Sequence, residues 1–341
     1  MKRQNGKGLL MAAAGAAGLC AVRAIFRKAG EYRLRDRVVL ITGGSRGLGL
    51  VMARELAREG AHIAICARDV EELNRARDEL DTLGANVLAV PCDVTDRQLV
   101  EEMARSVREY FGQIDVLINN AGVIEVGPME VMTIEDYEKA MKTHFWGPLY
   151  TVLAVLPEMR LRGEGRIVNI ASIGGKISVP HLLPYSASKF ALVGFSEGLR
   201  AELKKDGVVV TTVCPGLMRT GSPVNATFKG QHRAEYAWFT ISDSLPVTSM
   251  AAERAARQII RAFKRGDAEV ILSIQAKAAA LFHGIFPGLT ADMLGLVNRL
   301  LPGPGGIGEA SARGYESESD LAPSWLTALS DRAAMRNNEI S

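Results

Sequence analysis

VVLITGGSRGLGLVMARELAREG, residues 38–60, is the stretch from which the fold of this chain can be inferred. Residues 38–42 are apolar or β-branched and too few for a helix, so they predict a buried parallel strand. The glycine-rich turn after them opens into apolar residues at helical spacing, and the predicted helix stops at Gly60. A strand, a glycine turn and a helix in this order are the architecture of a dinucleotide-binding site.

Three glycines of this turn have separate tasks in such a site. Gly43 permits the tight turn, Gly47 lets the backbone approach a pyrophosphate, and Gly49 allows close packing of helix and strand. The phosphates lie at the helix N-terminus, where unpaired N–H groups and the helix dipole favour an anion. The spacing is T-G-x-x-x-G-x-G, not the GxGxxG of the larger dehydrogenases.

The residues after the second predicted strand, 61–66, bear on the choice of cofactor. An acidic residue there would bind the adenosine ribose hydroxyls of NAD, but Ala67 stands in that place and Arg68 follows it. Arg46 lies inside the glycine turn as well. Two guanidiniums favour a 2′-phosphate, so NADP(H) is predicted in preference to NAD(H). In the alternative interpretation Arg68 is only solvated, and Asp69 only caps the next helix.

Strands continue to alternate with helices along the chain, and a long helix is predicted over 133–159. This alternation indicates the α/β class, with a doubly wound parallel sheet that binds ligands at the carboxyl ends of its strands. Asp93 and Asn120 follow two of these strands. Asp93 could accept a hydrogen bond from an adenine amino group, or it could cap the next helix. Asn120 fits a crevice where a ligand passes over the backbone, and turn chemistry alone would explain this residue nearly as well. The further strands are predicted at 86–91, 114–118, 166–170, 208–213 and 270–273.

Ser172, Tyr185 and Lys189 form the candidate catalytic group. Tyr185 and Lys189 are four residues apart, so a helix places them on one face. A nearby ammonium favours the phenolate, and the tyrosine can then exchange a proton with a substrate oxygen that the Ser172 hydroxyl polarises. A tyrosine and a lysine at this spacing occur by chance in many chains, so the group gains weight only from the dinucleotide site upstream.

Together these residues resemble the short-chain dehydrogenase/reductase family, in its NADP-preferring branch, over roughly residues 36–275. The motifs that carry the resemblance are TGGSRGLG at 42–49, DV at 93–94, NNAG at 119–122, Ser172, YSASK at 185–189, and PG at 215–216 with Thr220. The resemblance implies a single Rossmann domain with a seven-stranded sheet. It also implies hydride transfer between a nicotinamide and an alcohol or carbonyl carbon.

The resemblance also implies residue roles. Tyr185 would be the acid/base, Lys189 would hold the nicotinamide ribose and lower the tyrosine pKa, and Ser172 would position the substrate oxygen. No metal is expected. The cofactor contacts predicted in all are Gly43, Ser45, Arg46, Gly47, Leu48, Gly49, Arg68, Asp93, Val94, Asn120, Ala121, Gly122, Tyr185, Lys189, Pro215, Gly216 and Thr220.

One position departs from the family pattern. The fourth catalytic residue of the family is an Asn three residues before a Gly, and here His144 precedes Gly147 at that distance. The family's Asn offers its main-chain carbonyl to a relay water, and a backbone carbonyl survives replacement by His. The imidazole could also donate a proton of its own, because its pKa lies near neutrality, or it could merely pack there.

The two ends of the chain lie outside the family pattern. Residues 8–22 are uncharged and are flanked by basic residues. Extended to residue 26, this run predicts an uncleaved membrane-associating helix within the segment 1–35. A signal peptide and a disordered tail are the alternatives. Arginines after the run would keep the main body on the cytoplasmic side. Residues 221–247 correspond to a substrate lid, and 276–302 to a helical extension that could pack on the lid, touch a membrane or lie at an oligomer interface. Residues 303–341 correspond to a mobile tail in which SWLTAL, 324–329, could dock locally.

Composition narrows the function classes. The net charge of +3 over 341 residues is too small to argue for nucleic acid as a partner. Cys20, Cys66, Cys92 and Cys214 have no metal-ligand spacing, which predicts free thiols in a reducing compartment. The expected partners are a small apolar carbonyl or alcohol substrate, a membrane surface and further copies of the chain.

The sequence thus predicts an NADP(H)-dependent oxidoreductase that interconverts a lipophilic ketone or aldehyde and an alcohol. Aromatic residues of the lid, Phe228, Tyr236, Trp238 and Phe239, suggest the lipophilic substrate, and surface aromatics of a partner interface would look the same. Two alternatives stay open, namely a 3-oxoacyl thioester reductase and a non-catalytic NADP(H)-binding sensor or scaffold.

Overall fold

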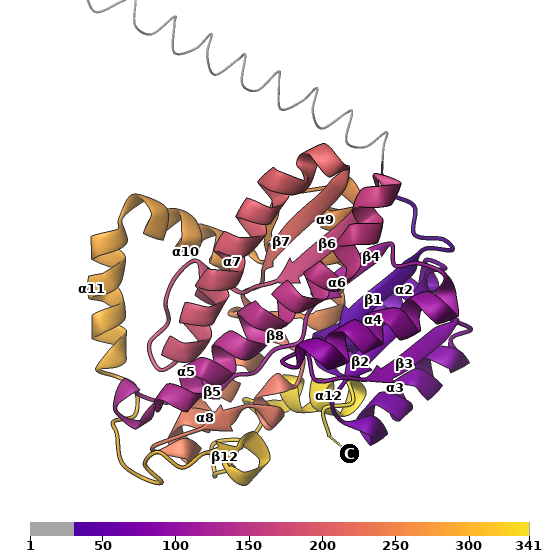
Figure 1. The fold of residues 1–341 in the computed structure, drawn as a ribbon. Coiled ribbons are helices and arrows are strands. Elements are labelled where there is room, and N and C mark those ends of the chain that lie inside the picture. Colours follow the sequence, from indigo (N-terminus) through magenta and orange to yellow (C-terminus); the bar gives the residue numbers. More distant parts are fainter. Residues whose placement is uncertain (1–30, 341) are drawn as a thin grey trace, which may run out of the picture.

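A computed structural model describes residues 31–340, and its centre is a seven-stranded sheet (Figure 1). Every pairing in this sheet is parallel. The predicted doubly wound sheet is therefore confirmed, and each strand boundary lies within two residues of its prediction. The strand order is β11 (Glu269–Ile271), β7 (Val208–Cys214), β6 (Gly165–Ile170), β4 (Val116–Asn119), β1 (Val38–Thr42), β2 (His62–Ala67) and β3 (Val87–Pro91).

Helices cover both faces of the sheet, and alternate strand residues face opposite layers. Val39 and Ile41 of β1 belong to one core, whereas Val38 and Leu40 belong to the other. All four are nearly inaccessible, as the apolar run predicts for a strand buried on both faces. The first core contains residues of α2 (Gly47–Arg58), α3 (Val70–Thr82) and α9 (Ala252–Arg265), and the second contains residues of α4 (Arg97–Phe111), α6 (Gly147–Arg162) and α7 (Leu183–Leu203).

The long helix predicted over 133–159 is interrupted by one wide turn. Thr133 forms a capping box with Asp136 at the start of α5 (Ile134–Met141). A π-helical turn, Lys142–Trp146, then joins α5 to α6 and contains His144. Such π-turns occur frequently at functional sites.

The segment predicted as a lid is folded against the body of the protein. It contains a short 3₁₀ turn (Ser222–Asn225), β9 (Thr227–Phe228) and α8 (His232–Ser244). Phe228, Tyr236 and Phe239 are buried in one apolar cluster. Two small sheets complete this region: β5 (Glu125–Val126) with β9 and β12 (Ala312–Arg313), and β8 (Leu217–Arg219) with β10 (Ser249–Ala251).

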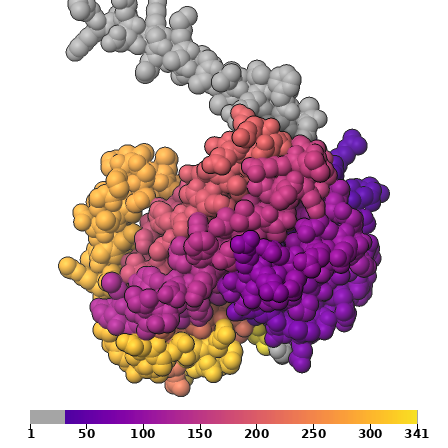
Figure 2. Space-filling model, viewed as in Figure 1, coloured from indigo at the N-terminus to yellow at the C-terminus, as the bar shows by residue number. Residues whose placement is uncertain are grey.

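The extension predicted over 276–302 forms two helices, α10 (Ile274–Ile285) and α11 (Pro287–Asn298). This pair stands at the edge of the molecule (orange in Figures 1 and 2). In each helix only one residue is buried, Ala276 in α10 and Thr290 in α11. The exposed apolar side chains of the pair are Ile274, Leu281, Ile285, Phe286, Leu289, Met293, Leu296 and Val297.

The prediction of a mobile tail from Gly303 is wrong for the described residues. β12 pairs with β9, a 3₁₀ turn (Gly314–Glu316) follows, and α12 (Ala328–Arg336) packs against α8. The polar composition misled the prediction, because these polar side chains hydrogen-bond to the folded body. The Arg313 guanidinium, for example, donates to the Asn225 carbonyl at 3.0 Å.

The predicted membrane-associating helix over 8–26 and Cys20 lie outside the described residues. Within residues 31–340, no helix is both long and apolar enough to cross a bilayer. Cys66, Cys92 and Cys214 are buried free thiols, as predicted.

Candidate active site

The glycine turn joins β1 to α2 and is too tightly packed for side chains at two of its glycines. Gly43 has a φ of +62°, in the left-handed region that favours glycine. A Cβ on Gly49 would lie 2.0 Å from the Gly43 carbonyl oxygen. The Asn120 amide braces the same turn by donating to the Gly43 and Thr42 carbonyl oxygens at 2.9 and 3.1 Å. Asn120 thus lies against the glycine turn, where its predicted role requires it.

The predicted 2′-phosphate corner contains both arginines and a carboxylate that sequence reasoning missed. Arg46 forms an ion pair with Glu72 at 2.7 Å, and the Ser45 hydroxyl also hydrogen-bonds Glu72. Arg68 is 63% exposed and lies 4.0 Å from Asp93. Arg68 is therefore more accessible to a ligand than Arg46, which is 35% exposed and forms the closer ion pair.

Two aspartates after strands have local roles. Asp69 caps α3 by accepting from the Glu72 N–H at 2.8 Å, as the alternative interpretation predicted. Asp93 accepts from the N–H and hydroxyl of Thr95 at 2.9 and 2.8 Å, while Asp96 caps α4. The alternative in which Asp93 caps that helix is therefore wrong.

Ser172, Tyr185 and Lys189 come together at the carboxyl end of β6, as predicted. Ser172 follows β6, and its hydroxyl accepts from the Gly174 N–H at 3.0 Å and lies close enough to the phenol of Tyr185 on α7 to lower the phenol pKa. The Lys189 Nζ lies 5.6 Å from the Tyr185 ring centroid and donates to the Ile170 carbonyl at 2.9 Å. The Tyr185 ring is half-buried, whereas Lys189 is only 4% exposed.

Burial controls the ionisation of this group. It raises the pKa of Tyr185, and the hydrogen bond from Ser172 acts in the opposite direction. Burial also lowers the pKa of Lys189 to about 7, so near neutral pH its ammonium is only partly populated. Burial therefore raises the pKa of Tyr185 by more than Lys189 was expected to lower it.

His144 is fully buried beside Tyr185, with its ring edge-on at a centroid distance of 5.4 Å. Its Nε2 accepts from the Val123 N–H at 3.1 Å, which places the ring proton on Nδ1. Nδ1 then donates to Ser188 Oγ at 2.7 Å, and Ser188 donates to the Tyr185 carbonyl. Burial and Lys189 hold the His144 pKa well below its usual value. A neutral ring with both nitrogens engaged favours packing over proton donation.

The other predicted contacts line the same edge of the sheet. Ala121 N–H donates to the Thr42 hydroxyl at 3.1 Å, and a Cβ on Gly122 would lie 3.2 Å from His144 Nε2. The Pro215 carbonyl accepts from the Ile173 N–H at 2.7 Å, which ties it to the residue after Ser172. Leu48 and Val94 are buried, and Gly216 and Thr220 lie on the segment from Pro215 to the predicted lid.

Sequence reasoning missed the C-terminal residues 337–339, which hydrogen-bond to the glycine turn. The Asn337 carbonyl accepts from the Gly47 N–H at 2.9 Å, and Glu339 lies 3.2 Å from Arg46. No local pattern signals this contact, because an Asn-Asn-Glu sequence is equally typical of a disordered terminus.

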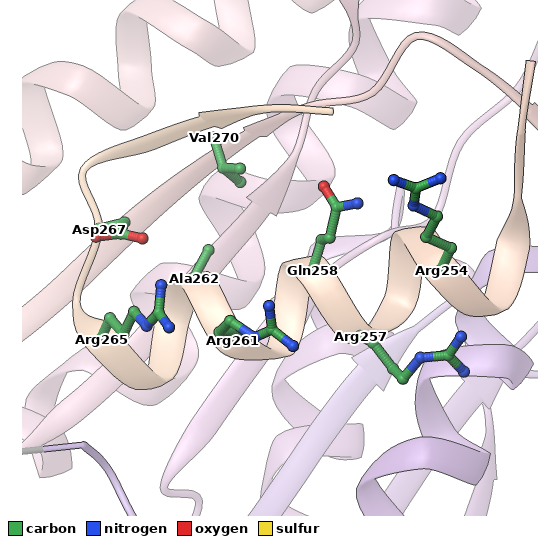
Figure 3. A pocket seen from close by; sticks show the side chains of 8 residues that line it. All are labelled: Arg254, Arg257, Gln258, Arg261, Ala262, Arg265, Asp267 and Val270. Atoms are coloured by element: carbon green, nitrogen blue, oxygen red, sulfur yellow. The ribbon is translucent and has the colours of Figure 1, made fainter. Parts of the chain in front are cut away.

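A separate hollow of about 380 Å³ lies along α9. Figure 3 shows the side chains of Arg254, Arg257, Arg261 and Arg265 along this helix, with Asp267 and Val270 beyond it. None of its lining residues is a predicted catalytic residue or cofactor contact.

Known proteins resemble this chain across the whole of the site. A family model described as short chain dehydrogenase matches residues 37–229, which include every predicted catalytic residue and cofactor contact. Dehydrogenase/reductase SDR family member 7B of Danio rerio is 32% identical over 297 residues, which are 85% of this chain and 94% of that protein.

Two solved structures share the fold. A short-chain dehydrogenase from Streptomyces avermitilis has a TM-score of 0.67 and 30% identity, and the match covers 77% of this chain and 97% of that one. An actinorhodin polyketide ketoreductase solved with NADPH has a TM-score of 0.62 and 32% identity, over 69% of this chain and 95% of that one.

Proposed function

The chain belongs to the short chain dehydrogenase family, whose enzymes interconvert alcohols and carbonyl compounds, and we propose that this one is NADP(H)-dependent and acts on a lipophilic ketone, aldehyde or alcohol. The observation that carries the proposal is the position of Tyr185. Its phenol lies beside the Ser172 hydroxyl, which acts to lower the phenol pKa, and its ring packs against an apolar cluster. That cluster contains Val126, Leu182, Phe228, Tyr236 and Phe239, with Ile124, Val179 and Trp238 packed against it.

The chain's own residues suffice for the proton side of the reaction. A bound nicotinamide supplies or accepts the hydride. Ser172 donates a hydrogen bond to the substrate oxygen, and Tyr185 gives a proton to that oxygen during reduction or removes one during oxidation. Lys189 holds its amino group on the same helix face, and His144 positions Tyr185 through Ser188.

The glycine turn fits the pyrophosphate of such a cofactor. A Cβ on Gly47 would lie 2.6 Å from the Glu339 carboxyl group, so an acidic group already lies against this glycine. No side chain caps α2, which leaves its N-terminus suited to an anion. Gly47, Leu48 and Arg46 would hold the phosphates.

The preference for NADP(H) rests on Arg68, which is exposed after β2 with no acidic residue at Ala67. The similarity to a ketoreductase solved with NADPH supports the same choice. We expect Arg68→Ala to weaken NADPH binding roughly 10- to 100-fold and NADH binding little, because hydrogen bonds to charged groups contribute about 1.5–3 kcal/mol. Fluorescence titration of both cofactors measures the ratio, with Arg160→Ala on α6 as the control. Equal affinities in the unmodified chain would contradict the NADP(H) preference.

The similarity to a polyketide ketoreductase supports a second candidate, reduction of a 3-oxoacyl thioester. Turnover of alkyl ketones of increasing chain length, followed by NADPH absorbance, separates the two candidates. We expect kcat/KM for the ketones to rise about three- to fourfold per methylene until the apolar cluster is filled, because a buried methylene contributes about 0.8 kcal/mol. A flat series, together with fast reduction of a 3-oxoacyl thioester, would favour the second candidate.

A further inference from the structure

The C-terminal segment, defined as residues 337–339, lies on the surface that the cofactor should occupy. Figure 1 shows α12, which ends at Arg336 just before this segment, near α3. The Asn337 carbonyl accepts from the Gly47 N–H at 2.9 Å. The Asn337 amide donates to the Thr220 carbonyl at 3.1 Å. One residue thus connects the predicted pyrophosphate and nicotinamide regions.

Asn338 covers the other side of the glycine turn. Its amide nitrogen donates to the Ser45 and Glu72 carbonyl oxygens at 2.9 and 3.0 Å. Its amide oxygen accepts from Arg75 at 2.9 Å. The side chain therefore bridges the turn to α3, over the corner where the adenosine half was predicted to bind.

Glu339 places a carboxyl group at the N-terminus of α2, and burial raises its pKa to about 7. Its carboxylate is 3.2 Å from Arg46 and accepts from the Asn225 amide at 2.8 Å, and the residue is only 8% exposed. One carboxylate oxygen lies 2.6 Å from the place of a Cβ on Gly47. A helix N-terminus favours a negative group at this point, whether it is a carboxylate or a phosphate.

We propose that residues 337–339 are an intramolecular competitor of the dinucleotide, which must leave the glycine turn before the cofactor binds. The inference rests on the proposed NADP(H)-binding function. A pyrophosphate cannot share the Arg46 and Gly47 surface with this segment, because the Asn337 carbonyl already accepts from the Gly47 N–H and the Glu339 carboxyl group already lies 3.2 Å from Arg46. The chain therefore exists in a closed form with the segment docked and an open form that can bind cofactor.

The proposal predicts that freeing the glycine turn tightens cofactor binding. The apparent dissociation constant equals the intrinsic one divided by the open fraction, so a segment docked nine-tenths of the time weakens binding about tenfold. A chain that ends at Arg336 should therefore bind NADPH about tenfold or more tightly than the full chain. Fluorescence titration with NADPH measures both constants after a thermal melt has shown that both chains are folded.

A point substitution gives the same test without shortening the chain. Asn338→Asp replaces the amide that donates to Ser45 and Glu72 with a carboxylate facing two carbonyl oxygens. The acceptor for Arg75 is kept, and the added negative charge cannot itself attract NADPH. We expect Asn338→Asp also to tighten NADPH binding. Asn298→Asp, the same change at an exposed position on α11, should leave the constant unchanged.

Hydrogen exchange supplies a readout that does not depend on affinity. In the closed form the Glu339 and Asn337 N–H groups donate to the carbonyls of Ala334 and Ala333. Saturating NADPH should accelerate exchange at these amides in the full chain. Unchanged exchange, or unchanged or weaker NADPH binding after both changes, would overturn the proposal while leaving the enzyme assignment intact. If neither the full nor the shortened chain bound NADPH or NADH, the proposed function itself would fail.

Discussion

Tyr185→Phe is expected to lower kcat by about 100- to 10,000-fold at saturating NADPH, which is the range of general acid–base catalysis. The phenol lies beside the Ser172 hydroxyl, where it can give a proton to a substrate oxygen held by that hydroxyl. The apolar contacts of the ring remain in phenylalanine, so the fold and the NADPH dissociation constant should change little. Steady-state kinetics and a fluorescence titration measure the two quantities separately.

Tyr110→Phe is the matched control for this change. Tyr110 lies on α4 with 57% of its surface exposed, so loss of its hydroxyl should leave turnover unchanged. A Tyr185→Phe protein that kept turnover within about threefold would remove Tyr185 from the role of acid/base. If a cellular phenotype of the protein also survived this change, the sensor or scaffold alternative would gain support.

Gly49→Ala is expected to weaken NADPH binding by at least about tenfold and to lower the free energy of unfolding by roughly 1–3 kcal/mol. The added methyl would lie 2.0 Å from the Gly43 carbonyl oxygen and 2.7 Å from the Asn120 amide nitrogen. The turn must then open, which breaks the bonds from Asn120 to Gly43 and Thr42. NADPH titration and urea unfolding measure the two effects.

Gly198→Ala in α7 makes the same chemical change where there is space. A Cβ there meets nothing within 4 Å, so helix propensity alone predicts a gain of about 0.5–1 kcal/mol and unaltered NADPH binding. A Gly49→Ala protein that bound NADPH like the unmodified chain would show that the tight contact between Gly49 and Gly43 is dispensable.

Much of the fold was predictable because the strands are short apolar runs with turn residues after them. β1, with its five consecutive buried residues, and α7, with Tyr185 and Lys189 one turn apart, are examples. The sequence patterns that predict these two elements are local, and each agrees with the strand or helix found in the structure. The order of the strands across the sheet has no such local signal.

Parts of the site depended on contacts between distant residues. Glu72 lies on α3, where the sequence predicts only a solvent-exposed side chain, yet its carboxylate forms an ion pair with Arg46 inside the glycine turn. His144 could be a proton donor or a packed side chain on sequence alone. Only its burial against Val123 and Ser188 favours packing, because those partners occupy both ring nitrogens.

The sequence by itself determined the family, the parallel sheet and the meeting of Ser172, Tyr185 and Lys189 at one strand edge. These follow from local periodicity and from the geometry of parallel strands. Only the tertiary structure decided that the C-terminal segment lies on the glycine turn, where Asn338 bonds to Ser45 across 293 positions of sequence. A contact of that range depends on the whole chain folding back, and polar residues without periodicity give no sign of the surface they will meet.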